Sequence, residues 1–163
     1  MNGTYRATAG RIRMELQEIA RVVKRTEHIW RQATTSTDDY YVDATALNLH
    51  GFYAGLERLF EIIANGVDQA KPSGPHWHQE LLRQMTAEIP AVRPPVLSLE
   101  TMERLDRYRG FRHVVRNVYT FHFDAEQIDL LVRQLPRTMA QVSQELLAFA
   151  HFLAQVAEGK GIG

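Results

Sequence analysis

The spacing of apolar residues constrains the fold of this chain more than any other feature. Between Tyr5 and about Ala33, and again between about Tyr41 and Gln69, apolar side chains recur every three or four residues. That spacing places them on one face of an α-helix. The first segment carries Ile12, Leu16, Ile19, Val23 and Trp30, and the second carries Leu49, Phe52, Tyr53, Leu56, Leu59, Phe60 and Ile63. No segment convincingly predicts a strand, so we expect long helices and no sheet.

Polar and proline-containing breaks divide the chain into further helices. Residues 34–39 form a Thr-, Ser- and Asp-rich break after the first helix, and residues 71–75, with two prolines, end the second. A short helix is expected from about His76 to Glu88. The prolines at 90, 94 and 95 then predict an extended loop.

Two capping residues predict the starts of the last two helices. Ser98 is expected to cap a fourth helix that runs to about Phe121, and Asp124 to cap a fifth that reaches about Ala157. Pro136 lies inside the fifth helix and should kink it. These elements predict an all-α fold, an antiparallel helical bundle of about five helices in one domain covering residues 1–163.

Composition excludes several classes of function. The 163 residues contain no cysteine, which rules out disulfides, thiolate zinc sites and cysteine nucleophiles and is compatible with the cytoplasmic location that we expect. Nineteen basic residues balance nineteen acidic ones, so non-specific coating of nucleic acid is not expected, although a local basic site is compatible with this balance. No run of apolar residues is long enough to span a membrane, and the first residues lack the apolar core of a secretory signal.

The segment from Arg109 to His122 carries most of the functional information. Three arginines, two histidines, an asparagine and a tyrosine fall within these 14 positions, with no acid among the arginines. On an ideal helix one broad face holds Arg109, Arg112, His113, Arg116, Asn117 and Thr120, with Tyr119 at its edge. Arginine binds phosphate bidentately, and histidine transfers protons near neutral pH. The segment therefore predicts a site that binds a phosphate and moves a proton without a metal.

An alternative interpretation makes the same arginines structural. Glu57, on the second helix, could be the carboxylate that pairs with Arg112 or Arg116, and the basic face would then be a buried ion network. His50 and Tyr53 on that helix could face a cleft, or could be satisfied by hydrogen bonds at a helix interface. On this interpretation the protein is a helical dimerisation module.

The sequence His76-Trp77-His78 resembles a metal-binding pattern only weakly. Two histidines two positions apart suit a strand better than a helix, and no carboxylate is fixed nearby. We therefore expect no metal and no other cofactor, and we expect Trp77 to anchor the core.

Residues 111–119, Phe-Arg-His-Val-Val-Arg-Asn-Val-Tyr, resemble the motif of HEPN-domain proteins, specifically the HepT-like toxin ribonucleases. That motif is an arginine, a polar residue and, a few positions later, a histidine often followed after one residue by a tyrosine. Arg112 and His113 match its first two positions and Tyr119 matches the tyrosine. Asn117 stands where the family often has histidine. Outside the motif, the long first helix and residues 40–53 and 77–82 are also similar to this group.

A second alignment of the motif is also possible. Arg116 and Asn117 are followed, after four residues, by His122. His122 falls on the apolar side of an ideal helix, so it would need a helix end or bend near Thr120 to reach the polar face.

The resemblance implies a homodimer whose two motifs line one cleft, and metal-independent cleavage of RNA by attack of the 2′-hydroxyl on the adjacent phosphate. Arg112, with Arg116, would stabilise the developing phosphorane charge, and His113 or His122 would transfer the proton. Together with Arg109, the two arginines would bind RNA.

The resemblance also implies a protein partner, a small nucleotidyltransferase antitoxin of the MNT type. It would adenylylate Tyr119 and so block the cleft. Because asparagine cannot act as a general base, Asn117 leaves two alternatives. Either His113 or His122 has taken over proton transfer, or the protein is a non-catalytic HEPN subunit that binds substrate or partner for a nucleotidyltransferase.

Overall fold

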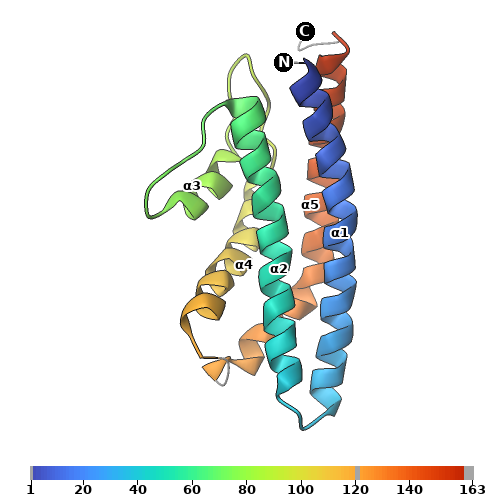
Figure 1. Cartoon of the computed structure of the whole chain (residues 1–163), viewed down its shortest axis with the longest axis vertical. Helices are drawn as coiled ribbons and strands as arrows, with labels where there is room; N and C mark the ends of the chain where they lie inside the picture. The colour runs from blue at the N-terminus through green and yellow to red at the C-terminus, as the bar shows by residue number, and fades with distance from the viewer. Residues whose placement is uncertain (1, 120–121, 160–163) are drawn as a thin grey trace.

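The computed structural model describes residues 2–119 and 122–159, and the regular structure in these ranges is helical (Figure 1). The helices are α1 (Asn2–Thr35), α2 (Tyr40–Ile63), α3 (Trp77–Gln84), α4 (Leu99–Asn117) and α5 (Ala125–Ala157), and a π-helical turn η1 (Ala64–Asp68) continues α2. In the described ranges extended pairing is limited to one isolated bridge, Ile89 with Arg93. The predicted all-α bundle of five helices without strands is confirmed.

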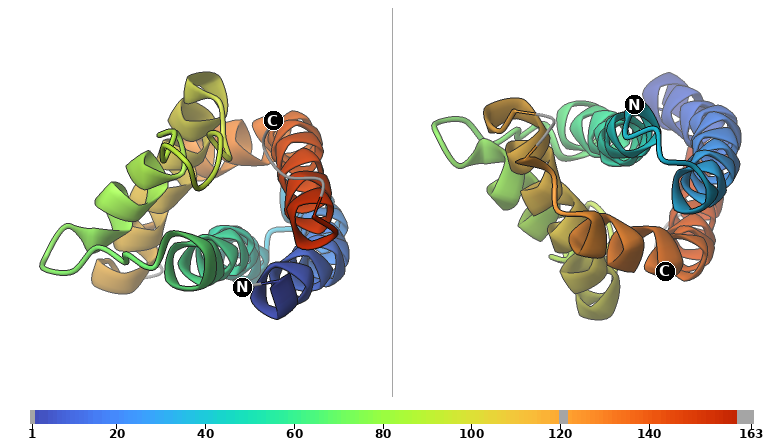
Figure 2. Two further views of the ribbon diagram at one scale, coloured as in Figure 1. Left: turned by 90° about the horizontal axis from the view of Figure 1, so that it is seen from above. Right: turned by 90° about the horizontal axis from the view of Figure 1, so that it is seen from below.

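The four long helices alternate in direction, so the start of α1 and the end of α5 lie at the same end of the bundle (Figure 1). Seen along the bundle, α2, α1, α5 and α4 surround a common core, and α3 lies outside it beside α2 and α4 (Figure 2). Fully buried side chains fill the core, including Phe52, Leu56 and Phe60 of α2 and Leu146 of α5. Within the part of the chain that the structure describes, no helix is long and apolar enough to cross a membrane.

The second long helix differs from its prediction at its C-terminal end. Instead of continuing as an α-helix to Gln69, it widens into the π-helical turn η1, and Gln69 takes a left-handed conformation with φ of 54°. The last residue of this turn, Asp68, forms an ion pair with the buried Arg93. The apolar spacing does not predict this π-helical turn, because Arg93, which pairs with Asp68, lies 25 positions later in the sequence.

Helix α4 begins as predicted and ends early. The Ser98 side chain accepts a hydrogen bond from the Thr101 amide (3.2 Å), which confirms the predicted N-cap. The helix stops at Asn117, not near Phe121, and Val118 is extended with φ of −122° and ψ of 140°. Within the last turn, the Asn117 amide group donates to the His113 carbonyl at 2.8 Å. Thr120 and Phe121 lie outside the described residues.

The other helix boundaries follow the predictions more closely. Helix α1 is slightly longer than expected at both ends, and α3 stops at Gln84 instead of Glu88. Asp124 caps α5 by accepting from the Glu126 amide at 3.0 Å, as predicted. Pro136 lies within α5, whose first part runs at an angle to the remainder (Figures 1 and 2).

Candidate functional site

A pocket of about 480 Å³ lies where the C-terminal half of α4 faces the start of α3. The α4 residues that line it are five that the sequence singled out: Arg109, Arg112, His113, Arg116 and Asn117. The rest of its lining comes from the segment that leads into and begins α3: Pro75, His76, His78 and Gln79. The predicted polar face of α4 is therefore the wall of a real cavity.

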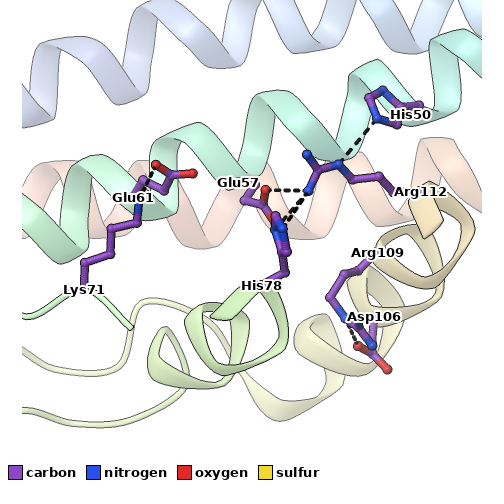
Figure 3. A network of polar contacts seen from close by, with 8 residues as sticks. All are labelled: His50, Glu57, Glu61, Lys71, His78, Asp106, Arg109 and Arg112. Atoms are coloured by element: carbon purple, nitrogen blue, oxygen red, sulfur yellow. Dashed lines mark hydrogen bonds and ion pairs between the residues drawn. The ribbon is translucent and has the colours of Figure 1, made fainter. Parts of the chain in front are cut away.

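At the pocket, Arg112 of α4 joins residues from two other helices, α2 and α3 (Figure 3). Its Nη1 lies 2.9 Å from Oε1 of Glu57 on α2 and 2.9 Å from Nδ1 of His78 on α3. The other oxygen of Glu57, Oε2, lies 2.8 Å from the same Nδ1 of His78. The Glu57 side chain is only 5% exposed, against 19% for Arg112 and 26% for His78. Glu57 is therefore the most buried member of this triad, and the side chains of Arg112 and His78 reach the pocket.

Two contacts on Nδ1, one with Glu57 and one with Arg112, bear on the placement of the His78 proton, and the charged carboxylate favours a proton there. If Nδ1 carries the proton, it donates to Oε2 of Glu57 while Arg112 satisfies Oε1. If Nδ1 is bare, it can accept from Nη1 of Arg112 at 2.9 Å, but its lone pair also faces a carboxylate oxygen at 2.8 Å, which is repulsive. The first arrangement satisfies both oxygens of Glu57 and leaves Nε2 of neutral His78, which lies 3.5 Å from Nη1 of Arg112, as the acceptor nitrogen of the ring.

His50 completes the surroundings of Arg112. Its Nε2 accepts a long hydrogen bond, 3.4 Å, from Nε of Arg112. Burial lowers the pKa of His50, the charges of Arg112 and Arg116 lower it further, and Glu57 opposes them. His50 is thus held in its neutral form, in which Nε2 can accept from the guanidinium.

Tyr53 lies on the same face of α2, between His50 and Glu57. Its side chain is fully buried, and its hydroxyl has no hydrogen-bond partner among the residues that the structure describes. Burial, reinforced by the negative charge of Glu57, raises the pKa of Tyr53 above its ordinary value. The phenol therefore stays protonated.

The three arginines of the predicted face have different electrostatic surroundings. Arg112 pairs with Glu57, so the hypothesis that this carboxylate neutralises an arginine of α4 is confirmed for Arg112. Arg109 pairs at 2.7 Å with Asp106, one turn earlier on its own helix. The guanidinium of Arg116 is exposed and has no ion pair or side-chain hydrogen bond within residues 2–119 and 122–159. Arg116 is the pocket arginine whose charge remains available to an anion.

His113 and Asn117 form a second polar pair on the rim. Nδ2 of Asn117 lies 3.2 Å from Nδ1 of His113. Because an amide NH₂ only donates, Nδ1 of His113 must accept, and in the neutral ring the proton is on Nε2. His113 is exposed and has an amide, not a carboxylate, as its partner.

Comparison with known proteins identifies the family. A family model described as HepT-like protein matches residues 44–153, from the first turns of α2 to the last turns of α5. The chain belongs to the HepT-like proteins. No curated protein and no solved structure matches it. The matched range includes the pocket and the Arg112 triad of this HepT-like protein.

Two residues of the predicted HepT-like motif do not line the pocket. Tyr119 lies two positions beyond the end of α4 and its side chain is 74% exposed. His122 is also exposed, and its amide donates to the Tyr119 carbonyl at 2.9 Å. Helix α4 ends before Thr120, as the second alignment of the motif required, but the pocket lining does not include His122.

Sequence reasoning missed the contribution of α3 to this HepT-like site. His76 and His78 were considered only as metal ligands, yet both line the pocket. In the described residues no group of three or more potential ligands is placed to hold a metal ion. Trp77 is half-buried against the core and stacks on the His78 ring, with centroids 3.7 Å apart. The sequence feature that could have drawn attention to His78 is the adjacent Trp77, because its indole stacks on the imidazole and limits the rotation of that ring.

Proposed function

We propose that this HepT-like protein is a metal-independent endoribonuclease toxin. It cleaves RNA by attack of the ribose 2′-hydroxyl on the adjacent phosphate and leaves a 2′,3′-cyclic phosphate and a 5′-hydroxyl. The observation that carries the proposal is the pocket in which Arg112 and Arg116 of α4 stand beside the imidazoles of His78 and His113. Phosphate binding and proton transfer are the two requirements of this reaction.

The arginines have separate parts in this proposal. Arg116, whose charge is not neutralised by a described residue, attracts the phosphate of RNA, and Arg109 extends the basic surface along α4. Arg112 is anchored by Glu57 and still reaches the pocket, so it meets the negative charge that develops on the phosphorane. A fixed guanidinium at this position needs no reorganisation during the reaction.

The proposal includes two partners. A second copy of the chain forms a homodimer in which the two pockets line one cleft for RNA. A cytoplasmic nucleotidyltransferase antitoxin of the MNT type neutralises the toxin by adenylylating Tyr119. The exposure of Tyr119 just beyond α4 supports that modification, because an enzyme must reach its hydroxyl. The added phosphate would be attached to the chain two positions after Asn117, which lines the pocket.

A second candidate function has its own supporting observations. Glu57 neutralises Arg112, and asparagine stands at position 117 where the family often has histidine. A HepT-like subunit without catalytic activity, which binds RNA or a nucleotidyltransferase through Arg116, would show both features. A helical dimerisation module would show the neutralisation of Arg112 by Glu57.

The deciding experiment is RNA cleavage by purified protein in EDTA. Wild type, Arg116→Ala and Arg112→Ala are compared with Arg25→Ala, which removes an exposed arginine from α1, a helix that does not line the pocket. Cyclic-phosphate ends from wild type and Arg25→Ala, with activity lost in Arg112→Ala, are expected. Absence of cleavage by folded wild-type protein with unmodified Tyr119 would contradict the ribonuclease and favour the non-catalytic subunit.

A further inference from the structure

The most informative unassigned feature is the histidine that α3 brings to the motif of α4. His78 lies 34 positions before Arg112 in the sequence, and its Nδ1 lies 2.9 Å from the Arg112 guanidinium. No residue of α4 contributes an imidazole in contact with a carboxylate in the described structure. The site therefore holds an imidazole that the linear motif does not contain.

The surroundings of His78 are those of an oriented base. With the proton on Nδ1, Glu57 accepts from that nitrogen at 2.8 Å, and Arg112 donates to the other oxygen of Glu57 from an Nη1 that also lies 2.9 Å from Nδ1. Trp77 stacks on the ring at a centroid distance of 3.7 Å, which limits its rotation. A carboxylate that fixes one ring nitrogen leaves the other as the acceptor, the arrangement by which enzymes orient a general base. In His78 that second nitrogen, Nε2, belongs to a side chain that lines the pocket.

The two histidines that the motif offered are less suited to this role. His113 accepts from the Asn117 amide through Nδ1, so its neutral Nε2 carries a proton and cannot accept one. Among the described residues, it also contacts no carboxylate that could stabilise the imidazolium formed by proton transfer. His122 lies outside the pocket lining.

We propose that His78, oriented by Glu57, is the proton acceptor of this site, a proposal that rests on the ribonuclease function proposed above. Nε2 takes the proton of the ribose 2′-hydroxyl as the bond from O2′ to phosphorus forms. The bond from phosphorus to O5′ breaks, and O5′ takes a proton from solvent water. The imidazolium then returns its proton to the hydroxide left in solvent. In this scheme His78 is a catalytic residue and Glu57 a positioning residue.

The scheme also explains why Asn117 is tolerated. The family position that often holds histidine lies on α4, one helical turn beyond His113. Here the Asn117 side chain at that position donates to the His113 carbonyl at 2.8 Å. Proton transfer is supplied from α3 instead, by a histidine that lines the same pocket as Arg112 and Arg116.

The test compares single-turnover RNA cleavage by wild type, His78→Ala and Glu57→Gln. The matched histidine control is His28→Ala, which removes an exposed histidine from α1, a helix that does not line the pocket, and is expected to cleave like wild type. His78→Ala is expected to reduce the cleavage rate by about 100-fold or more, the usual size of a lost general base. Its affinity for an uncleavable 2′-deoxy oligonucleotide, measured by fluorescence anisotropy, is expected to stay near that of wild type. Added imidazole should restore part of the activity of His78→Ala and none of Arg112→Ala, which a purely structural histidine would not permit.

A second measurement does not depend on activity. Long-range ¹H–¹⁵N spectra of the histidine rings should show neutral His78 protonated at Nδ1 in wild type, and a changed tautomer balance in Glu57→Gln. Neutral His78 protonated at Nε2 in wild type would overturn the proposal, as would wild-type cleavage rates in a folded His78→Ala variant. In that last case loss of cleavage in Arg112→Ala would leave the ribonuclease function standing. Absence of cleavage by wild type would remove both proposals.

Discussion

Two arginine–carboxylate pairs in this protein have the same chemistry and different surroundings. Arg93 and Asp68 are both 0% exposed, and the pair is bidentate, with 2.5 Å from Nε to Oδ1 and 2.8 Å from Nη2 to Oδ2. The remaining donors of Arg93 bond to three backbone carbonyls, those of Gln84, Ala87 and Pro94. Every N–H of the Arg93 guanidinium is therefore used inside the protein.

The Arg112–Glu57 pair is open by comparison. Arg112 is partly exposed, its Nη1 is shared between Glu57 and His78, and its Nε makes only a long contact with His50. A pocket lies against it, whereas Arg93, in the loop between α3 and α4, is buried and bonds to η1, to the end of α3 and to its own loop. The comparison teaches that an ion pair alone does not separate a structural arginine from a functional one. What separates the two is the number of guanidinium N–H donors that remain available to a ligand.

The largest effect is expected from breaking the closed pair. Asp68→Ala leaves the buried Arg93 charge without its partner, so the free energy of unfolding should fall by about 3–5 kcal/mol. Urea unfolding measures this loss. Glu61→Ala is the matched control, because its pair with Lys71 is partly exposed and should contribute about 1 kcal/mol or less. Equal losses in the two variants would contradict the assignment of Asp68–Arg93 as the structural pair.

Glu57→Gln should have a smaller effect on stability than Asp68→Ala. Gln keeps an oxygen that can accept from Arg112, and the guanidinium can recover hydration through the pocket, so a loss of about 1–2 kcal/mol is expected. The same urea titration applies. A loss as large as that of Asp68→Ala would show that the Arg112 pair is as closed as the Arg93 pair, and would favour the ion-paired dimerisation module.

Anion binding should distinguish the two arginine environments. Inorganic phosphate at about ten times its dissociation constant should stabilise the wild-type protein by about 1.4 kcal/mol if it binds only the folded state. Arg116→Ala should lose this stabilisation, because Arg116 supplies the available charge of the pocket, and Arg25→Ala should keep it. Thermal unfolding with and without phosphate at fixed ionic strength provides the measurement. Equal stabilisation of all three proteins would place the anion elsewhere.

The smallest effect is a pH dependence that comes from His50. Its pKa is lowered in the folded protein, mainly by burial and then by Arg112 and Arg116, against the opposing charge of Glu57. Below the ordinary pKa of about 6.5, His50 of the unfolded chain binds a proton that His50 of the folded chain does not bind. The free energy of unfolding therefore decreases as the pH is lowered. Above that pKa both states are neutral and the effect vanishes.

His50→Gln should therefore show a shallower loss of stability than wild type as the pH falls below about 6.5, the ordinary histidine value. Urea unfolding of both proteins across that range isolates the His50 contribution, because the other titrating groups are shared. Parallel curves would contradict the lowered pKa.

Much of the fold was predictable because its determinants are local. The three- and four-residue spacing of apolar side chains predicts the long helices, and Ser98 and Asp124 cap helices through bonds to amides only two or three positions away. The end of α4 was harder to predict. Val118 ends it by taking an extended backbone conformation, which the apolar periodicity does not predict.

The sequence by itself determined the helices and the common face of Arg109, Arg112, His113 and Arg116, because residues three or four apart on a helix must lie together. Only the tertiary structure decided what meets that face. Glu57 lies 55 positions from Arg112, and His78 lies 34 positions away on a short helix whose placement depends on two loops. Packing of the whole bundle brings these residues, which are far apart in the sequence, into contact. The same packing buries Arg93 against Asp68 and leaves the charge of Arg116 available to an anion.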